Sequence, residues 1–277
     1  MQIINIIFWN TNKKNLVNCL QEMLIENNVD LLILAEYPYS INELCHNTNT
    51  QSCLQYKPLP QNIGCKRIYG LINNKYNAEL LQEQSPYRFV KISKPYYSYE
   101  LIVAMVHAPS KLWAEASTQK TGIANILNDL IVQEHQNCCE YTMAIGDFNA
   151  SPFEETCIGA SAMHAIPFPD AVKKEGRRVQ RKIYKQFYNP TWKFFGNRTA
   201  PYTTYYCDRS GQETNFYWYA LDQVVVRPSL IKAFDRESLR IITKTKSHRL
   251  LNEDNIPNKI NYSDHLPLFC RLNEEMM

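Results

Sequence analysis

The sequence predicts an α+β fold, in which buried β-strands and amphipathic helices form one domain. Apolar, β-branched runs at residues 3–8 and 31–35 flank a segment whose leucines repeat at helical spacing. This β-α-β opening favours a parallel strand pair with a right-handed crossover. Further apolar runs follow, and several carry a polar side chain at one end. A chain of 277 residues can bury a large core.

The composition is that of a globular protein of nearly neutral charge. The formal net charge is +3 at pH 7, so only a local patch can indicate nucleic acid. The nine cysteines form no Cys-x-x-Cys pair, which favours reduced thiols in an intracellular protein over zinc or disulfides. The N-terminal segment lacks a basic region and a cleavage site, and its apolar run is too short for a membrane span. We therefore expect a cytoplasmic protein.

Apolar runs and helical spacing place the remaining elements. Strands are expected at residues 68–72, 87–92, 101–106, 141–145, 221–226 and 239–243, and after residue 265. A second amphipathic helix is expected from Trp113 to about His135. Residues 40–63 show no clear pattern, and residues 244–260 are expected to form a polar loop.

Polar groups directly follow four of these strands. Gly146-Asp147-Phe148-Asn149 breaks the strand at 141–145, which places a carboxylate and an amide at its end. Glu36, His107 and Asn10 end other strands in the same way. Each has an ordinary alternative: a turn, a solvated strand end or a structural histidine. Ligand-binding groups of α/β proteins nevertheless concentrate at such strand ends.

Two further positions, Asp222 and the pair Asp264-His265, stand just before strands. If the late strands run antiparallel to the early ones, all six strand ends meet at one rim. This convergence favours one domain over residues 1–277, because the first and last groups must come together. It also makes coincidence a poor explanation of the pattern.

The residue types suit metal-assisted hydrolysis of a phosphate ester. Mg²⁺ prefers oxygen ligands, so we expect Glu36 as the main metal ligand, with Asn10 and Asp264 nearby or acting through water. Asp222 and His265 are the candidate dyad, since a carboxylate can orient a histidine and stabilise its protonated form.

The remaining catalytic candidates act on water, phosphate or the leaving group. Asp147 and Asn149 can position an attacking water or the phosphate. His107 can protonate the leaving oxygen. The metal ion would neutralise the charge that develops on the phosphate.

Residues 153–219 form a basic and aromatic-rich insert. Arg177, Arg178, Arg181 and Lys182 belong to a cluster of seven cations between residues 173 and 185. Aromatic residues such as Trp192 follow. The insert can be a solvated basic helix beside a self-packed aromatic loop, or a phosphate-binding stripe with rings that stack on bases.

The motifs resemble those of the endonuclease/exonuclease/phosphatase superfamily, which includes deoxyribonuclease-like and apurinic-endonuclease-like enzymes. The resemblance rests on six motifs, which follow the family's order along almost the whole chain: Phe8-Trp9-Asn10, Ala35-Glu36, Val106-His107-Ala108-Pro109, Gly146-Asp147-Phe148-Asn149, Leu221-Asp222 and Ser263-Asp264-His265. It implies a four-layer α/β sandwich, with two packed mixed β-sheets flanked by helices. It also implies Mg²⁺ or Mn²⁺ dependence, phosphoester hydrolysis and the roles given above. Whether Asp147 or His265 activates the water stays open.

Some details differ from individual branches of the family. His107-Ala108-Pro109 is similar to the secreted deoxyribonuclease branch, yet no secretion signal or paired cysteines accompany it. Tyr206-Cys207-Asp208-Arg209 is similar to a motif of inositol-phosphate phosphatases but precedes no apolar strand, so Asp222 fits the position better than Asp208. The sequence thus predicts a divalent-metal-dependent phosphodiesterase, a nuclease acting on DNA or RNA. The alternatives are a small-molecule or lipid phosphoesterase and a non-catalytic binding module.

Overall fold

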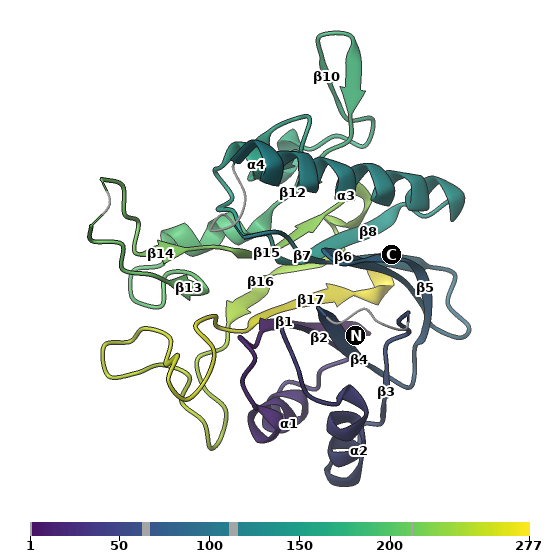
Figure 1. The fold of residues 1–277 in the computed structure, drawn as a ribbon. Coiled ribbons are helices and arrows are strands. Elements are labelled where there is room, and N and C mark those ends of the chain that lie inside the picture. The colour runs from purple at the N-terminus through teal and green to yellow at the C-terminus, as the bar shows by residue number, and fades with distance from the viewer. Residues whose placement is uncertain (1, 63–66, 111–115, 212) are drawn as a thin grey trace.

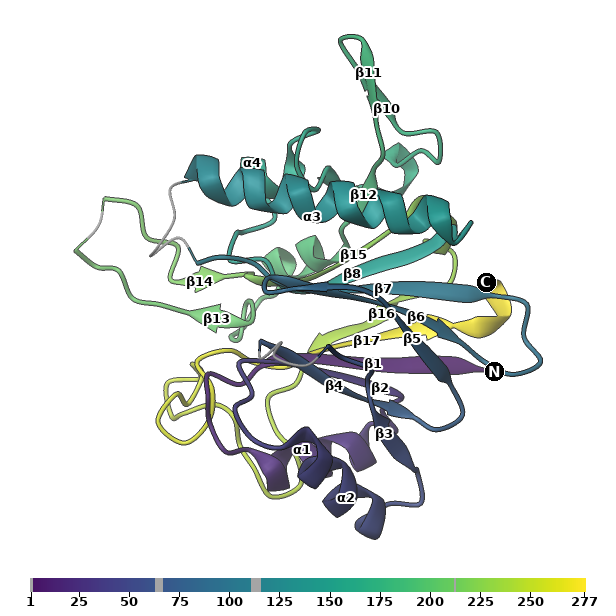
Figure 2. The same ribbon diagram turned by 45° about the vertical axis from the view of Figure 1, so that its right-hand side comes forward.

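Two β-sheets stack face to face, and helices cover both outer faces (Figure 1). The computed structural model describes residues 2–62, 67–110, 116–211 and 213–277. Helices α1 (Val17–Glu26) and α2 (Ile41–Gln51) lie on one side of the stack. Helices α3 (Ala116–Gln136) and α4 (Glu155–Ile158) lie on the other (Figure 2). This arrangement confirms the predicted four-layer sandwich.

The first sheet has six strands in the order β16-β17-β1-β2-β4-β3. Their bounds are β16 Phe234–Ile241, β17 Leu268–Asn273, β1 Ile3–Asn10, β2 Leu31–Ala35, β4 Ile68–Asn73 and β3 Tyr56–Pro58. β1 and β2 are parallel, and β17 runs antiparallel to β1. The parallel pair at the chain's start is therefore confirmed.

The second sheet has seven strands in the order β5-β6-β7-β8-β15-β12-β9. Their bounds are β5 Asn77–Gln84, β6 Tyr87–Ser93, β7 Glu100–His107, β8 Tyr141–Asp147, β15 Asp222–Val226, β12 Phe187–Tyr188 and β9 Ala165–Ile166. β7 and β8 are parallel, and β15 runs antiparallel to β8. Both large sheets are thus mixed, as predicted.

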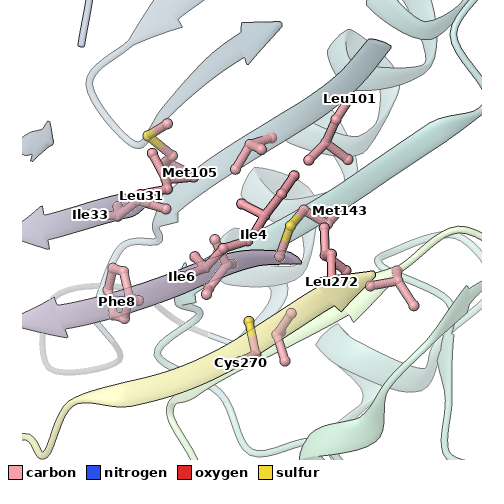
Figure 3. Packing of buried hydrophobic residues seen from close by; sticks show 14 of the residues in the cluster. Ile4, Ile6, Phe8, Leu31, Ile33, Leu101, Met105, Met143, Cys270 and Leu272 are labelled. Atoms are coloured by element: carbon pink, nitrogen blue, oxygen red, sulfur yellow. The ribbon is translucent and has the colours of Figure 1, made fainter. Parts of the chain in front are cut away.

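Apolar side chains from both sheets form the central core (Figure 3). Ile6 and Ile33 come from the first sheet, while Leu101 and Met143 come from the second. Separate apolar clusters join α1 and α2 to the first sheet and α3 to the second. Each central strand is buried on both faces, which explains why the strands read as continuous apolar runs.

Several segments differ from the sequence prediction. The unassigned stretch 40–63 contains α2, capped by Ser40 Oγ, which accepts from the backbone N–H of Glu43 at 3.2 Å. Strand β5 was not predicted, and β16 begins at Phe234 rather than at residue 239. The basic stretch is not a helix but a hairpin of β10 (Arg177–Val179) and β11 (Lys182–Tyr184). Cys65 and the expected helix start at Trp113 lie outside the described residues.

Short elements complete the fold. They are the 3₁₀ turns η1 Pro169–Ala171, η2 Pro190–Gly196, η3 Pro228–Leu230 and η4 Glu274–Met276, and the hairpin strands β13 Tyr205–Tyr206 and β14 Trp218–Tyr219. No disulfide joins any of the eight described cysteines. Among the described residues, no helix combines the length and the apolar character needed to cross a membrane.

Candidate active site

The candidate residues meet at one edge of the stacked sheets. The parallel register of β7 and β8 sets His107 beside Asp147, and the antiparallel register of β15 sets Asp222 opposite Asp147. In the other sheet, β1 and β2 end side by side, which brings Asn10 next to the residue before Glu36. The predicted convergence of strand ends at one rim is confirmed.

His265 and Asp222 form a buried pair across the two sheets. Nδ1 of His265 lies 2.8 Å from Oδ2 of Asp222. Because a carboxylate accepts, Nδ1 carries the proton and Nε2 is left to face Asp147, whose Oδ2 lies 3.9 Å away. Burial disfavours the charged imidazole, but Asp222 and Asp147 outweigh burial and raise the pKa of His265. Burial raises the pKa of Asp222, and the attraction of His265 opposes that rise.

Asp147 is held by two amide groups. Nδ2 of Asn10 donates to its Oδ2 at 3.1 Å, and the backbone N–H of Asn149 donates to its Oδ1 at 2.8 Å. The first bond joins β1 to β8 and so links the two sheets. Nδ2 of Asn149 donates to the carbonyl of Ala108 at 2.8 Å. The side-chain amide of Asn149 therefore ties together the chain segments that follow β7 and β8.

The position before Asp147 requires glycine, because a side chain there would clash with β7. A Cβ at Gly146 would lie 1.9 Å from the carbonyl oxygen of Val106. Only glycine allows β8 to approach β7 so closely, and this approach brings the two strand ends together.

Neighbouring residues fix the position of His265. Nε1 of Trp9 donates to the carbonyl of His265 at 2.8 Å, and Ser263 Oγ donates to the carbonyl of Asn10 at 2.6 Å. The ring of Tyr205 lies against the imidazole, with centroids 4.7 Å apart. The sequence analysis missed Tyr205, because only the bridge between β13 and the segment before β17 reveals the contact.

Glu36 and His107 form the second contact between the sheets. Oε1 of Glu36 lies 3.3 Å from Nε2 of His107. The hydrogen bond from His107 lowers the pKa of Glu36; burial opposes it, and Lys13 strengthens the effect. Nδ1 of His107 is buried without a hydrogen-bond partner among the described residues. Both side chains line a pocket of about 390 Å³.

The donor set at Glu36 fits a divalent cation. The Glu36 side chain is 28 % exposed and opens to the pocket, which leaves its oxygens accessible. Asn10 adds an amide oxygen, and such oxygen donors suit Mg²⁺ or Mn²⁺. Potential ligand atoms of Asp147, Asp222 and His265 also lie within 4.8 Å of one another. There, however, Nδ1 of His265 already donates to Asp222.

Asp264 and Glu36 line different pockets. The Oδ1 atom of Asp264 lies 3.4 Å from Ser263 Oγ, and the side chain lines a pocket with Tyr205 and Lys259. Among the described residues, no hydrogen bond joins Asp264 to Glu36 or Asn10. Its role as a metal ligand stays a prediction.

The basic hairpin does not reach the rim. Arg177, Arg178, Arg181 and Lys182 are exposed on β10 and β11 and the turn between them. This hairpin projects beyond α3, whereas β13 and β14 extend from another side of the molecule (Figures 1 and 2). Trp192 packs against Phe153, with ring centroids 6.4 Å apart. Nucleic-acid binding by these residues stays a prediction.

The exposed Asp208 is not part of the site. Its Oδ1 accepts from the backbone N–H of Ser210 at 2.9 Å, within the loop between β13 and β14. The carboxylate that meets His265 is Asp222, as the sequence indicates.

The four-layer sandwich is also the fold of solved structures from the endonuclease/exonuclease/phosphatase family. A protein of that family from Bacteroides thetaiotaomicron matches with a TM-score of 0.55 and 11 % identity, covering 98 % of each chain. No protein-family model matches the sequence, and no curated protein matches it.

Two solved structures with DNA share the fold. D. rerio TDP2 complexed with single strand DNA product has a TM-score of 0.57 and 13 % identity, covering 99 % of this chain and 100 % of that one. The 3′ phosphatase NExo from Neisseria bound to product DNA hairpin has a TM-score of 0.53 and 14 % identity, covering 98 % and 99 %. At these identities the likeness establishes the fold.

Proposed function

We propose that this chain is a divalent-metal-dependent phosphodiesterase that hydrolyses nucleic acid. The observation that carries the proposal is the pair of contacts between the sheets at one rim: His265 with Asp222, and Glu36 with His107. The DNA in the complexes of TDP2 and NExo supports a nucleic-acid substrate.

The imidazolium of His265 supplies a charged donor where the phosphate gains negative charge. The raised pKa of His265 keeps the imidazole protonated, so its Nε2–H donates to a phosphate oxygen. Asp222 fixes this orientation through Nδ1. Preorganised donors of this kind stabilise the transition state because they need no reorganisation during the reaction.

Asp147 is the better candidate for activating the water. A protonated His265 cannot accept a proton, whereas the carboxylate of Asp147 can. Asn10 and Asn149 hold this carboxylate in place. Nε2 of His265 lies 3.9 Å from Oδ2 of Asp147, so the two side chains can act on the phosphate and on the water at one centre.

Glu36 would hold the metal ion, with Asn10 beside it. A bound Mg²⁺ or Mn²⁺ would polarise the phosphate and neutralise its charge. His107 contacts Glu36 and lines the same pocket, which supports a role for His107 in protonating the leaving oxygen.

The test is a substrate panel with the purified protein. DNA, RNA and phospholipid are incubated with Mg²⁺, with Mn²⁺ and with EDTA. We expect metal-dependent cleavage of nucleic acid and none with EDTA. Turnover of phospholipid alone would favour a lipid phosphoesterase, and turnover of none with either metal would favour a binding module.

A further inference from the structure

The pocket beside Glu36 is lined by two basic side chains that have no role in the proposed catalytic steps. Lys13 and Arg67 line it together with Glu36 and His107. Its volume of about 390 Å³ falls in the range of about 300–1,000 Å³ that is usual for small-ligand sites. The pocket can therefore hold a part of the substrate beyond the reacting phosphate.

Backbone hydrogen bonds hold the three charged residues in a row. The N–H of Lys13 donates to the carbonyl of Glu36 at 3.0 Å, and the N–H of Glu36 donates to the carbonyl of Arg67 at 3.1 Å. Lys13 and Glu36 have positive φ angles of 60° and 51°. Residues other than glycine rarely adopt a positive φ angle, and those that do are found most often at ligand-binding sites.

The charges leave the pocket with a surplus of cations. Lys13 and Arg67 face a single carboxylate, Glu36, in this pocket, and among the described residues neither cation forms an ion pair. Lys14, the next residue, instead donates to the carbonyl of Ile260 at 3.2 Å. Once Glu36 binds a metal ion, both cations are available to an anion.

We propose that Lys13 and Arg67 bind a second phosphate of the substrate, adjacent to the phosphodiester that is hydrolysed. This inference rests on the proposed function. Each nucleotide of a strand carries such a phosphate, and Lys and Arg bind phosphate through charge-assisted hydrogen bonds. The pocket accordingly selects a substrate with two neighbouring phosphates over one with a single phosphate.

The experiment compares three thymidine dinucleotides in the presence of Mg²⁺. TpT has only the phosphodiester, pTpT adds a 5′-phosphate and TpTp adds a 3′-phosphate. We expect one added phosphate to raise kcat/KM of the wild type by about tenfold, the order of one charge-assisted contact. The favoured substrate shows on which side of the cleaved bond the pocket lies.

Variants then assign the gain to the two cations. Lys13→Met and Arg67→Met should bring the ratio of kcat/KM between the two-phosphate substrate and TpT close to 1. Lys13→Arg should restore most of it. Lys14→Met is the matched lysine control, and Arg236→Met is the arginine control, because Arg236 lies on β16 over the ring of Tyr188. Both controls should keep the wild-type ratio.

Two results would overturn the assignment. One is a wild-type ratio near 1 for both pTpT and TpTp. The other is an unchanged ratio in Lys13→Met and Arg67→Met. If the wild type hydrolyses neither dinucleotides nor longer DNA or RNA with either metal, the proposed function itself fails, and the inference falls with it.

Discussion

At the residue scale, the buried pair of His265 and Asp222 works only as a unit. Asp222 keeps Nδ1 protonated and the imidazole charged, while His265 compensates the burial of the carboxylate. Removing either partner leaves the other buried without its counter-charge. Residues that act together in this way lose activity non-additively.

We therefore predict similar losses from Asp222→Asn, His265→Ala and the double variant. Each should lower kcat by about 10²- to 10³-fold, the range for the loss of one preorganised hydrogen-bond donor. Steady-state kinetics on one oligonucleotide measures all three. If the two single losses multiply in the double variant, Asp222 and His265 act independently.

Glu36 gives a second prediction at this scale, which separates metal binding from folding. Glu36→Gln should abolish metal-dependent cleavage. It should leave the melting temperature of the metal-free protein nearly unchanged, because the side chain is partly exposed. In the wild type, Mg²⁺ should raise the melting temperature, since a ligand that binds only the folded state stabilises it. Full activity in Glu36→Gln, or the same Mg²⁺ shift, would remove Glu36 from the metal site.

A buried ion pair far from the rim supplies a stability prediction. Nε of Arg227 donates to Glu134 at 2.7 Å, and both side chains are almost fully buried. Burial raises the pKa of Glu134, but Arg227 and Lys185 outweigh it and hold the pKa below its usual value of 4.5. Glu134→Gln should cost about 3–5 kcal/mol in urea unfolding, because Arg227 keeps a buried charge without a partner.

The same pair makes stability depend on pH. The pKa of Glu134 is lower in the folded than in the unfolded chain, so its contribution is complete above the unfolded value of about 4.5. It is lost as the pH falls through the folded value. The Glu134→Gln variant should therefore lose less unfolding free energy than the wild type when the pH falls through this range. Glu140→Gln is the matched control, because Glu140 pairs with Lys174 on the surface and should matter little.

At the element scale, the hairpin of β10 and β11 carries the largest exposed basic cluster that the sequence predicts. Phosphate contacts release counterions, so log affinity falls with log salt by about 0.7–0.9 per contact. Replacing Arg177, Arg178, Arg181 and Lys182 by Ser in a His265→Ala parent should weaken oligonucleotide binding. The salt dependence should also become shallower, as anisotropy titrations at several salt concentrations can measure.

The position of this hairpin makes the experiment decisive. It projects beyond α3 rather than from the rim (Figure 2), so only a long substrate can reach both. We expect no effect of the four replacements on a dinucleotide. An unchanged salt dependence with a long oligonucleotide would exclude the hairpin from the binding surface.

The helices and strands differ in how well the sequence predicts them. The central strands were predictable because burial on both faces gives them continuous apolar runs, and the β-α-β opening predicted that β1 and β2 are parallel. β5 was missed because its residues are exposed or half-buried and read as polar. α2 was missed because most of its residues are polar, although Ser40 and Glu43 form the signal of a capped helix start.

The sequence also predicts some residues of the site and misses others, for similar reasons. Glu36, His107, Asp147, Asp222 and His265 could be predicted, because each directly precedes or follows an apolar strand. Arg67 could not, since it lies before β4, whose antiparallel direction becomes evident only in the sheet. Tyr205 belongs to a two-residue strand in a loop-rich insert, where no periodicity exists.

At the scale of the whole molecule, three contacts of the site join the two sheets of the sandwich. Asn10 of β1 meets Asp147 of β8 at 3.1 Å, and Glu36 after β2 meets His107 of β7 at 3.3 Å. His265 before β17 meets Asp222 of β15 at 2.8 Å. The site therefore exists only when the two sheets stack in one register, and the shared apolar core sets that register.

This shared core leads to a last prediction, that residues 1–277 unfold as one unit. Ile33 of β2 is fully buried in the core that also contains Met143 of β8. Ile33→Ala should cost about 2–5 kcal/mol. Hydrogen exchange followed by mass spectrometry should show the same loss of opening free energy in peptides from β2 and from β8. Val132→Ala, at an exposed position of α3, should change neither. If only the first sheet exchanges faster in Ile33→Ala, the two sheets open separately and the chain is not a single cooperative domain.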